Sequence, residues 1–303
     1  MKKVKFALIA VAVIVAGAVA GYGIYSNKDN IDFGEIVIDS IPEKDDKATR
    51  VISFNVRCAD DPEGSINNRS QLVTAILEQY APDSFGVQEA TSKWLRKLDS
   101  ALGDKYDRVG EARDQFGPFS EYGCVYYLKD KYNLIDSGTF WLSETPEKKY
   151  SVSYDSKCRR IATWAVLENK ETGERYTHLN THLDHGLEST REAQAQGLLE
   201  KMNQLQKVGK VVCTGDFNTN EDSKVYSAMT AVTDDTKAIA KNTQDGITYH
   251  AYGKKDETEG GPIDFIFVSK GVEALNYKII DNTVQGMYPS DHYALCADVY
   301  LNK

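Results

Sequence analysis

The feature that most constrains the fold is a series of short apolar runs, rich in β-branched residues, that recur between polar loops after residue 50. Runs of this length and composition are typical of buried β-strands. We expect strands over residues 51–56, 83–88, 123–128, 161–167, 176–181, 210–214, 265–268 and 294–300.

Two amphipathic helices interrupt this series. Residues 68–80 place Leu72, Ile76 and Tyr80 on one face and end before Pro82, and residues 190–207 carry a similar apolar stripe. Because strands outnumber helices and the helices fall between them, we expect a single α/β domain. The predicted architecture is a four-layer α/β sandwich, with two packed, mostly antiparallel sheets and helices on the outside.

The N-terminus carries a membrane-directed segment. Residues 6–25 are uncharged and almost wholly apolar, and lysines precede them. The run is long enough to span a bilayer, while Ala18-Val19-Ala20 resembles a signal-peptide cleavage site. Residues 1–26 are therefore either a signal peptide or an N-terminal membrane anchor. Both alternatives predict an extracytoplasmic protein, secreted or anchored to the cytoplasmic membrane and facing outward.

The rest of the chain divides into a tether and one domain. We interpret the acidic residues 27–50 as a polar tether, although the apolar patch at 36–38 is also compatible with an edge strand, and residues 51–303 as the catalytic domain. Removing the three lysines before the apolar run from the 36 basic residues leaves 33 against 45 acidic ones, a net charge of about −12. This charge disfavours long duplexes and favours small or lipid-borne phosphates.

The five cysteines are scattered, with no Cys-x-x-Cys pair and no spacing typical of zinc sites. Their surroundings indicate core residues. The sequence leaves any disulfide pairing open.

Acidic and amide side chains follow several expected strands. Asn55 and Glu89 lie at the ends of the strands 51–56 and 83–88, and adjacent parallel strands would bring them together at one rim. Magnesium prefers such oxygen ligands. Asp216 and Asn218, which follow the strand 210–214, are suited to orienting or deprotonating a water, although Gly215-Asp216-Phe217-Asn218 alone also reads as an Asx turn.

Two acid–histidine pairs and an arginine complete the candidate site. Asp264 can fix the tautomer of His292, and Glu121 can act in the same way on His182. Asp291 can reach a metal or a water. Arg160 is a candidate phosphate ligand, and Arg159 is an equal candidate on spacing alone.

These motifs resemble those of the endonuclease/exonuclease/phosphatase superfamily, which has the deoxyribonuclease I-like fold, over about residues 51–301. The pieces that carry the resemblance are Ser53-Phe54-Asn55, Gly86-Val87-Gln88-Glu89, the stretch from Ser137 to Pro146, Asn180-Thr181-His182-Leu183-Asp184-His185, Gly215-Asp216-Phe217-Asn218, Ile263-Asp264-Phe265-Ile266-Phe267 and Ser290-Asp291-His292.

The resemblance implies a Mg²⁺-dependent phosphoesterase, in which Mn²⁺ can substitute and water attacks phosphorus in line. It assigns Asn55, Glu89 and Asp291 to the metal. It implies catalytic roles for Glu121, His182, Asp216, Asn218, Asp264 and His292, and substrate contacts for Arg160 and Asn218.

Substrate and partners stay open at this stage. The substrate can be a nucleic acid, a nucleotide, a phospholipid or an inositol phosphate, cleaved by a nuclease, phosphodiesterase or phosphatase activity. We expect a monomer that contacts the membrane if the N-terminal segment is retained. The alternatives are a catalytically silent surface binding module on the same fold and a dinuclear zinc hydrolase, which the partial motif Asn180-x-His182-x-Asp184-His185 resembles.

Overall fold

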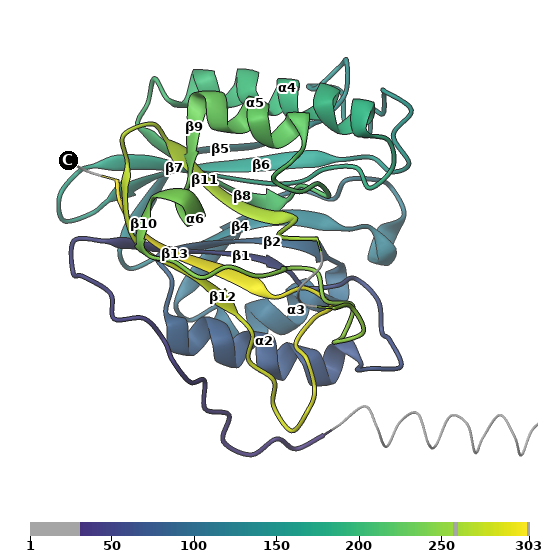
Figure 1. Ribbon diagram of the computed structural model, residues 1–303, viewed down its shortest axis with the longest axis vertical. Helices are drawn as coiled ribbons and strands as arrows, with labels where there is room; N and C mark the ends of the chain where they lie inside the picture. Colours follow the sequence, from purple (N-terminus) through teal and green to yellow (C-terminus); the bar gives the residue numbers. More distant parts are fainter. Residues whose placement is uncertain (1–30, 257–259, 302–303) are drawn as a thin grey trace, which may run out of the picture.

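The computed structural model describes residues 31–256 and 260–301, so the apolar segment at residues 1–26 lies outside the described residues. Within the described part, no helix is both long and apolar enough to cross a membrane. The described chain forms two sheets with helices on their outer faces (Figure 1).

The first sheet has seven strands in the order β10-β12-β13-β1-β2-β4-β3. Its strands are β1 (Thr49–Asn55), β2 (Ser84–Ala90), β3 (Tyr106–Val109), β4 (Tyr122–Leu128), β10 (Ala240–Asn242), β12 (Glu273–Ile280) and β13 (Ala294–Tyr300). The second sheet has the order β5-β6-β7-β8-β11-β9. Its strands are β5 (Tyr132–Trp141), β6 (Ile161–Asn169), β7 (Arg175–His182), β8 (Lys210–Asp216), β9 (Thr233–Asp235) and β11 (Asp264–Ser269).

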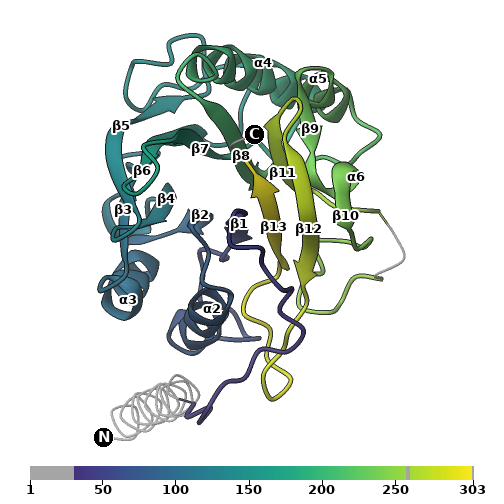
Figure 2. The ribbon, with the colours of Figure 1, turned by 90° about the vertical axis from the view of Figure 1, so that its left-hand side faces the viewer.

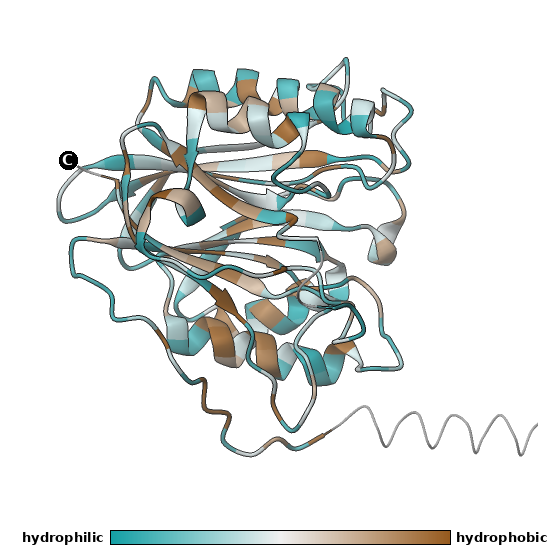
Figure 3. Ribbon diagram, in the orientation of Figure 1, coloured by the Kyte–Doolittle hydropathy of each residue, from teal (hydrophilic) through white to brown (hydrophobic). Residues whose placement is uncertain are grey.

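Most neighbouring strands are antiparallel, and the parallel pairs are β1/β2, β7/β8 and β10/β12. The helices are α2 (Ile66–Tyr80), α3 (Ser92–Leu102), α4 (Glu188–Leu205), α5 (Lys224–Val232) and α6 (Thr236–Ile239), with the 3-10 turn η1 (Gly117–Phe119). One apolar cluster joins α2 and α3 to the first sheet and another joins α4 and α5 to the second, while a third lies between the sheets (Figures 2 and 3). The predicted four-layer α/β sandwich is confirmed.

All of the expected strands and both expected helices are present, with ends shifted by a few residues. The strands β3, β5, β9, β10 and β12 and the helices α3, α5 and α6 were not predicted. β5 is exposed or partly exposed along most of its length, and buried and partly exposed positions mix along β12. Such strands have no continuous apolar run, which was the signal used to find the others.

Residues 31–48, which we interpreted as part of a tether, lie against the domain, and we call them the strap; residues 31–38 of the strap run along α2. The backbone N–H of Ile38 donates to Gln79 Oε1 at 3.0 Å, and Gln79 Nε2 donates to the carbonyl of Ile36 at 2.7 Å. Phe33 and Ile38 are buried. The patch at 36–38 therefore contributes apolar packing and side-chain hydrogen bonds and forms no strand.

A chain of hydrogen bonds crosses the interior between the two sheets. Ser84 in β2 contacts His178 Nδ1 in β7 at 2.7 Å, and His178 Nε2 contacts Thr214 Oγ1 in β8 at 2.9 Å. The Thr214 hydroxyl then donates to Asn180 Oδ1, which also accepts from Gln88 Nε2. Buried polar groups need such partners, so the chain fixes how the sheets align.

The second sheet lies close against Gly86 in β2. A Cβ at this position would lie 2.6 Å from Asn180 Cγ and would also collide with Asn180 Oδ1 and Thr214 Oγ1. The absence of a side chain at Gly86 is therefore what lets the inter-sheet hydrogen bonds form.

We predict that Gly86→Ala lowers the free energy of unfolding by about 1–3 kcal/mol or more, because the new methyl overpacks a rigid polar layer. The matched control is Gly197→Ala in α4, where a Cβ would meet nothing within 4 Å. There, stability should rise by roughly 0.5–1 kcal/mol. Urea unfolding of both variants measures the difference, and equal effects would contradict this account of the sheet interface.

Candidate active site

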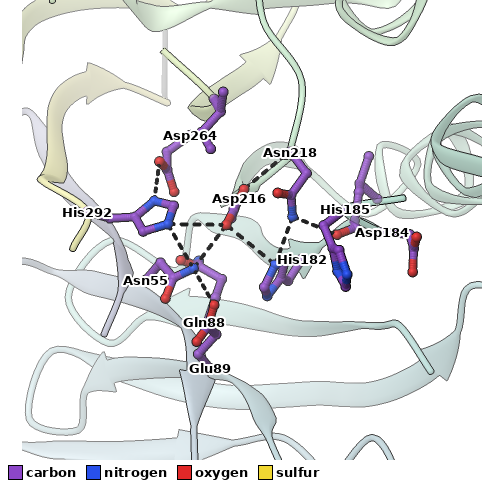
Figure 4. A network of polar contacts seen from close by, with 12 residues as sticks. Asn55, Gln88, Glu89, His182, Asp184, His185, Asp216, Asn218, Asp264 and His292 are labelled. Carbon is purple, nitrogen blue, oxygen red and sulfur yellow. Dashed lines mark hydrogen bonds and ion pairs between the residues drawn. The ribbon is translucent and has the colours of Figure 1, made fainter. Parts of the chain in front are cut away.

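The ends of four strands meet at one edge of the sandwich. β1 ends at Asn55, β2 carries Glu89 near its end, β7 ends at His182 and β8 ends at Asp216. The parallel pairs β1/β2 and β7/β8 bring their carboxyl ends together, as the sequence predicted for the first pair. Figure 4 shows the side chains converging there.

Glu89 reaches the site through an irregular backbone. Its φ is +60°, and the pairing of β2 with β4 shifts register between Val87 and Ala90. Such a bulge re-aims a side chain, and a non-glycine residue in this region is held there by its surroundings. The Glu89 carboxylate accepts hydrogen bonds from the backbone N–H of Cys58 at 2.9 Å and from Asn55 Nδ2 at 3.1 Å.

Asn55 acts in this structure as a hydrogen-bond donor between carboxylates. Its Nδ2 also lies 2.9 Å from Asp216 Oδ2, while its Oδ1 accepts from the N–H of Arg57 at 3.0 Å. In this structure its amide oxygen holds the backbone and its amide nitrogen holds Glu89 and Asp216. The assignment of Asn55 to a metal stays a prediction.

Asp216 lies at the centre of the site, and it does make the Asx-type contact that its motif suggested. Its Oδ1 accepts from the backbone N–H of Asn218 at 2.9 Å, which leaves Oδ2 facing Asn55, His182 and His292. Burial and the neighbouring Asp264 carboxylate raise the pKa of Asp216 to about 7. The turn and the catalytic interpretation are therefore compatible, because each uses a different oxygen.

Asp264 and His292 form the predicted pair. His292 Nδ1 lies 2.9 Å from Asp264 Oδ2, and both side chains are buried. Burial opposes protonation of His292, but Asp264, Asp216 and Asp291 outweigh it and raise the pKa of His292 to about 10. At neutral pH the ring is therefore an imidazolium, with Nδ1–H donated to Asp264 and the Nε2 side facing Asp216.

The second predicted pair, Glu121 and His182, does not form in the structure. Glu121 accepts from Arg113 Nη2 at 2.7 Å, whereas His182 Nε2 lies 3.0 Å from Asn218 Nδ2 and 3.4 Å from Asp216 Oδ2. Burial, followed by Arg160 and Arg113, holds the pKa of His182 well below its ordinary value. A neutral His182 accepts from Asn218, so the Asn218 side chain positions His182. The predicted substrate contact of Asn218 stays a prediction.

Arg160 is the better of the two arginines that the sequence left open. Its side chain is 4% exposed, and its Nη2 lies 3.2 Å from His185 Nδ1. Arg159 instead donates to the carbonyl of Tyr150.

Arg160 Nε and Arg113 Nε are both buried without a hydrogen-bond partner among the described residues. Each of these Nε atoms faces a carboxylate, that of Asp184 at 3.9 Å from Arg160 and that of Asp114 at 3.7 Å from Arg113. Both arginines also line the cleft described below, so their guanidinium groups bring positive charge to an anion bound there.

These side chains line a cleft of about 490 Å³. Its lining residues are Arg57, Cys58, Glu89, Arg113, Glu121, Cys158, Arg160, His182, His185, Asp216, Asn218, Tyr249, Ile263, Asp291 and His292. Arg57, Arg113 and Tyr249 were missed from the sequence. Arg57 follows Asn55 by two residues and was detectable by position, but Arg113 lies in a loop without any motif, and only folding brings it to the site.

A divalent cation fits the carboxylates at the centre of the cleft. Glu89, His182 and Asp216 offer ligand atoms within 4.8 Å of one another, and Asp216, Asp264 and His292 form a second such group. In the second group, Asp264 and His292 already satisfy each other, so the oxygens of Glu89 and Asp216 are the better place for a hard cation. Asp291, also predicted as a ligand, belongs to neither group, and its carboxylate lies 3.7 Å from Arg57 Nε.

The partial zinc-hydrolase motif has structural roles instead. Asn180 donates to the carbonyls of Val87 and Cys124 inside the sandwich. One oxygen of Asp184 accepts from Ser156 Oγ and from the backbone N–H of Lys157. Neither side chain belongs to a group of potential ligands in the described part of the chain, so the geometry does not support a dinuclear zinc site.

A two-sheet sandwich with buried carboxylates, an Asp–His pair and arginines at one edge defines a class of metal-assisted phosphoester hydrolases. The sequence profile of the Endonuclease/Exonuclease/phosphatase family matches residues 52–292, and the chain belongs to this family. It is accordingly a hydrolase of phosphoric esters.

Similar proteins include enzymes with different named substrates. A family member from Bacteroides vulgatus is 32% identical with a TM-score of 0.78, covering 84% of this chain and 99% of its own. A mannosyl-6-phosphatase of Bacteroides thetaiotaomicron is 28% identical with a TM-score of 0.75, covering 83% and 99%. The 3'-5'-exoribonuclease subunit Ccr4 of the CCR4-Not complex from Candida albicans is 26% identical over 90% of this chain and 44% of its own length. The chain spans about half the length of the curated relatives it matches.

We predict that Asp264→Asn lowers kcat by about 10²–10⁴-fold, because His292 loses the group that orients and charges it. The unfolding free energy should change by less than about 2 kcal/mol, since the variant also removes repulsion between Asp264 and Asp216.

The matched control is Asp298→Asn, in a buried bidentate pair with Arg50 far from the cleft. This control should lose about 3–5 kcal/mol of stability and keep its kcat. Steady-state kinetics and urea unfolding of both variants measure this. Equal loss of kcat in the two would refute a specific role for Asp264.

Proposed function

We propose that the chain is a Mg²⁺-dependent hydrolase of small or lipid-borne phosphoesters, with a preference for terminal phosphate groups. The observation that carries this proposal is the pair of guanidinium donors, Arg113 and Arg160, that line the same cleft as Asp216 and His292. A terminal phosphate is a dianion near neutral pH with three acceptor oxygens, and it can use both donors.

The residues divide the chemistry between them. Held by Glu89 and Asp216, Mg²⁺ would neutralise phosphate charge and orient the substrate. Asp216 Oδ2 faces the centre of the site and can orient the attacking water and accept its proton. The His292 imidazolium stabilises the negative charge that develops on the phosphoryl oxygens. The new bond forms between water oxygen and phosphorus as the ester P–O bond breaks, and the leaving oxygen takes a proton from solvent.

The relatives and the charge support different substrates. The similar mannosyl-6-phosphatase is named for a phosphomonoester substrate and supports that class for this chain. The similar Ccr4 subunit is named as an exoribonuclease and supports RNA. A net charge of −9 opposes a long polyanion, so the small substrate is favoured. A silent binding module is disfavoured, because Asp216, Asp264 and Asp291 would then be buried together for no chemical purpose.

Removing the proposed metal ligands tests the role of Mg²⁺. Glu89→Gln and Asp216→Asn should each lower kcat by at least about 10²-fold, and Glu89→Gln should raise the Mg²⁺ concentration needed for half-maximal rate. Glu188→Gln, an exposed acid at the start of α4, is the control and should behave as wild type. Hydrolysis of p-nitrophenyl phosphate is followed over a Mg²⁺ titration and with chelator. Full activity in chelator would exclude the proposed metal dependence.

The arginine pair is tested through substrate preference. Arg113→Met should raise KM for a phosphomonoester by roughly 10-fold or more, since a charge-assisted hydrogen bond contributes about 1.5–3 kcal/mol. The effect on a phosphodiester should be smaller, because it offers one negative charge. Arg175→Met, at the opposite end of β7, is the control. A uniform loss on both substrates, or none on either, would overturn the assignment of Arg113 to a terminal phosphate.

A further inference from the structure

The strap sets the direction from which the N-terminal segment reaches the domain. It runs parallel to α2, because Ile31 contacts Asn68 in the first turn of that helix and Ile38 contacts Gln79 near its end. The N–H of Ile31 donates to Asn68 Oδ1 at 3.0 Å, and Gln71 Nε2 donates to the Ile31 carbonyl at 3.1 Å. Ile31 is therefore fixed at the N-terminal end of α2, where the purple chain begins beside the helix (Figure 1).

The N-terminal end of α2 lies at the active-site edge of the sandwich. Arg69, in the first turn of α2, is fully buried and donates to the carbonyl of Val56 at 2.7 Å and to that of Pro289 at 3.3 Å. Val56 follows Asn55, and Pro289 precedes the segment that ends at His292. The chain consequently enters the domain at the same edge as the catalytic residues.

Only a short stretch separates this point from the apolar segment. The apolar run ends at Tyr25, and the six residue steps from Tyr25 to Ile31 span at most about 20 Å when fully extended. If residues 6–25 stay in a bilayer, Ile31 cannot lie further than this from the lipid headgroups, and the active-site edge of the domain is the edge held toward the membrane. A domain of this size held by its opposite end would place the cleft well beyond that reach.

Exposed apolar side chains surround the cleft on separate loops. Phe116 and Phe119 are 68% and 83% exposed, in the loop between Arg113 and Glu121, which both line the cleft. Leu187 is 52% exposed, two residues after the cleft residue His185. Aromatic and aliphatic side chains that project from separate loops can each insert among lipid headgroups. They are better suited to this role than to forming a continuous protein interface.

We infer that the retained N-terminal segment and the loops carrying Phe116, Phe119 and Leu187 hold the cleft against a membrane surface. The favoured substrate is then a phosphoester whose headgroup projects from that lipid surface. This statement about substrate rests on the proposed function, whereas the orientation of the domain does not.

Tryptophan scanning of the full chain in vesicles tests the orientation. Phe119→Trp is compared with Val208→Trp, because Val208 is 47% exposed and precedes β8 at the opposite end of the sandwich. Both variants and the wild type are reconstituted into phosphatidylcholine vesicles with and without brominated acyl chains. Wild-type emission supplies the background of the native tryptophans. Leu187→Trp is a second probe in case Phe119→Trp perturbs its loop.

We expect bromine quenching of Phe119→Trp to exceed that of Val208→Trp by at least about twofold, because interfacial side chains reach 5–10 Å into the acyl boundary. Equal quenching at both positions, or stronger quenching at Val208→Trp, would overturn the orientation. The orientation would also be overturned if the full chain did not float with the vesicles. None of these readouts needs catalysis, so failure of the proposed function would be recognised separately.

A linker insertion tests the consequence for substrate. A flexible Gly-Ser linker of roughly 30 residues between Asn30 and Ile31 should lower turnover of phosphatidic acid in the same vesicles by about tenfold, because effective concentration falls with tether length. Turnover of soluble p-nitrophenyl phosphate should not change. An equal change for both substrates, or none for the lipid, would refute a membrane-borne substrate.

Discussion

The structure depends on one directional chain of hydrogen bonds between the two sheets. Tyr176 donates to Ser84, Ser84 contacts His178, and His178 contacts Thr214, which donates to Asn180. Burial lowers the pKa of His178 to about 3, so the ring stays neutral and can accept at Nδ1 while it donates at Nε2. Apolar packing alone would let the sheets slide. This chain permits one alignment.

That alignment determines the active site. Asn55 and Glu89 come from the first sheet, whereas His182 and Asp216 come from the second. Their mutual distances are therefore set by how the sheets stack, and the polar layer lies a few residues earlier in three of these strands, β2, β7 and β8. The catalytic groups sit on a rigid scaffold, and irregular backbone occurs in the cleft at Arg57, Glu89 and Asn218, whose φ values are +60°, +60° and +50°.

The site also shows how three carboxylates can be buried close to one another. Asp216, Asp264 and Asp291 are all buried, and each has a partner: Asp216 accepts a hydrogen bond from Asn55, Asp264 pairs with His292, and Asp291 lies near Arg57. Burial and the neighbouring Asp264 carboxylate raise the pKa of Asp216 and favour binding of a cation there. Binding of a phosphate next to these carboxylates then depends on the metal and on the arginines at the wall of the cleft.

The sequence by itself determined the layered fold and most of the site, because buried strands appear as apolar runs and their polar ends mark the rim. It identified Glu89, Asp216, Asp264 and His292 for that reason. Only the tertiary structure decided which groups pair: Glu121 contacts Arg113 and not His182, and Asn55 serves as a donor. It also placed the strap on α2 and Arg113 in the cleft. These contacts join residues far apart in the chain through exposed or irregular segments, which carry no periodic signal.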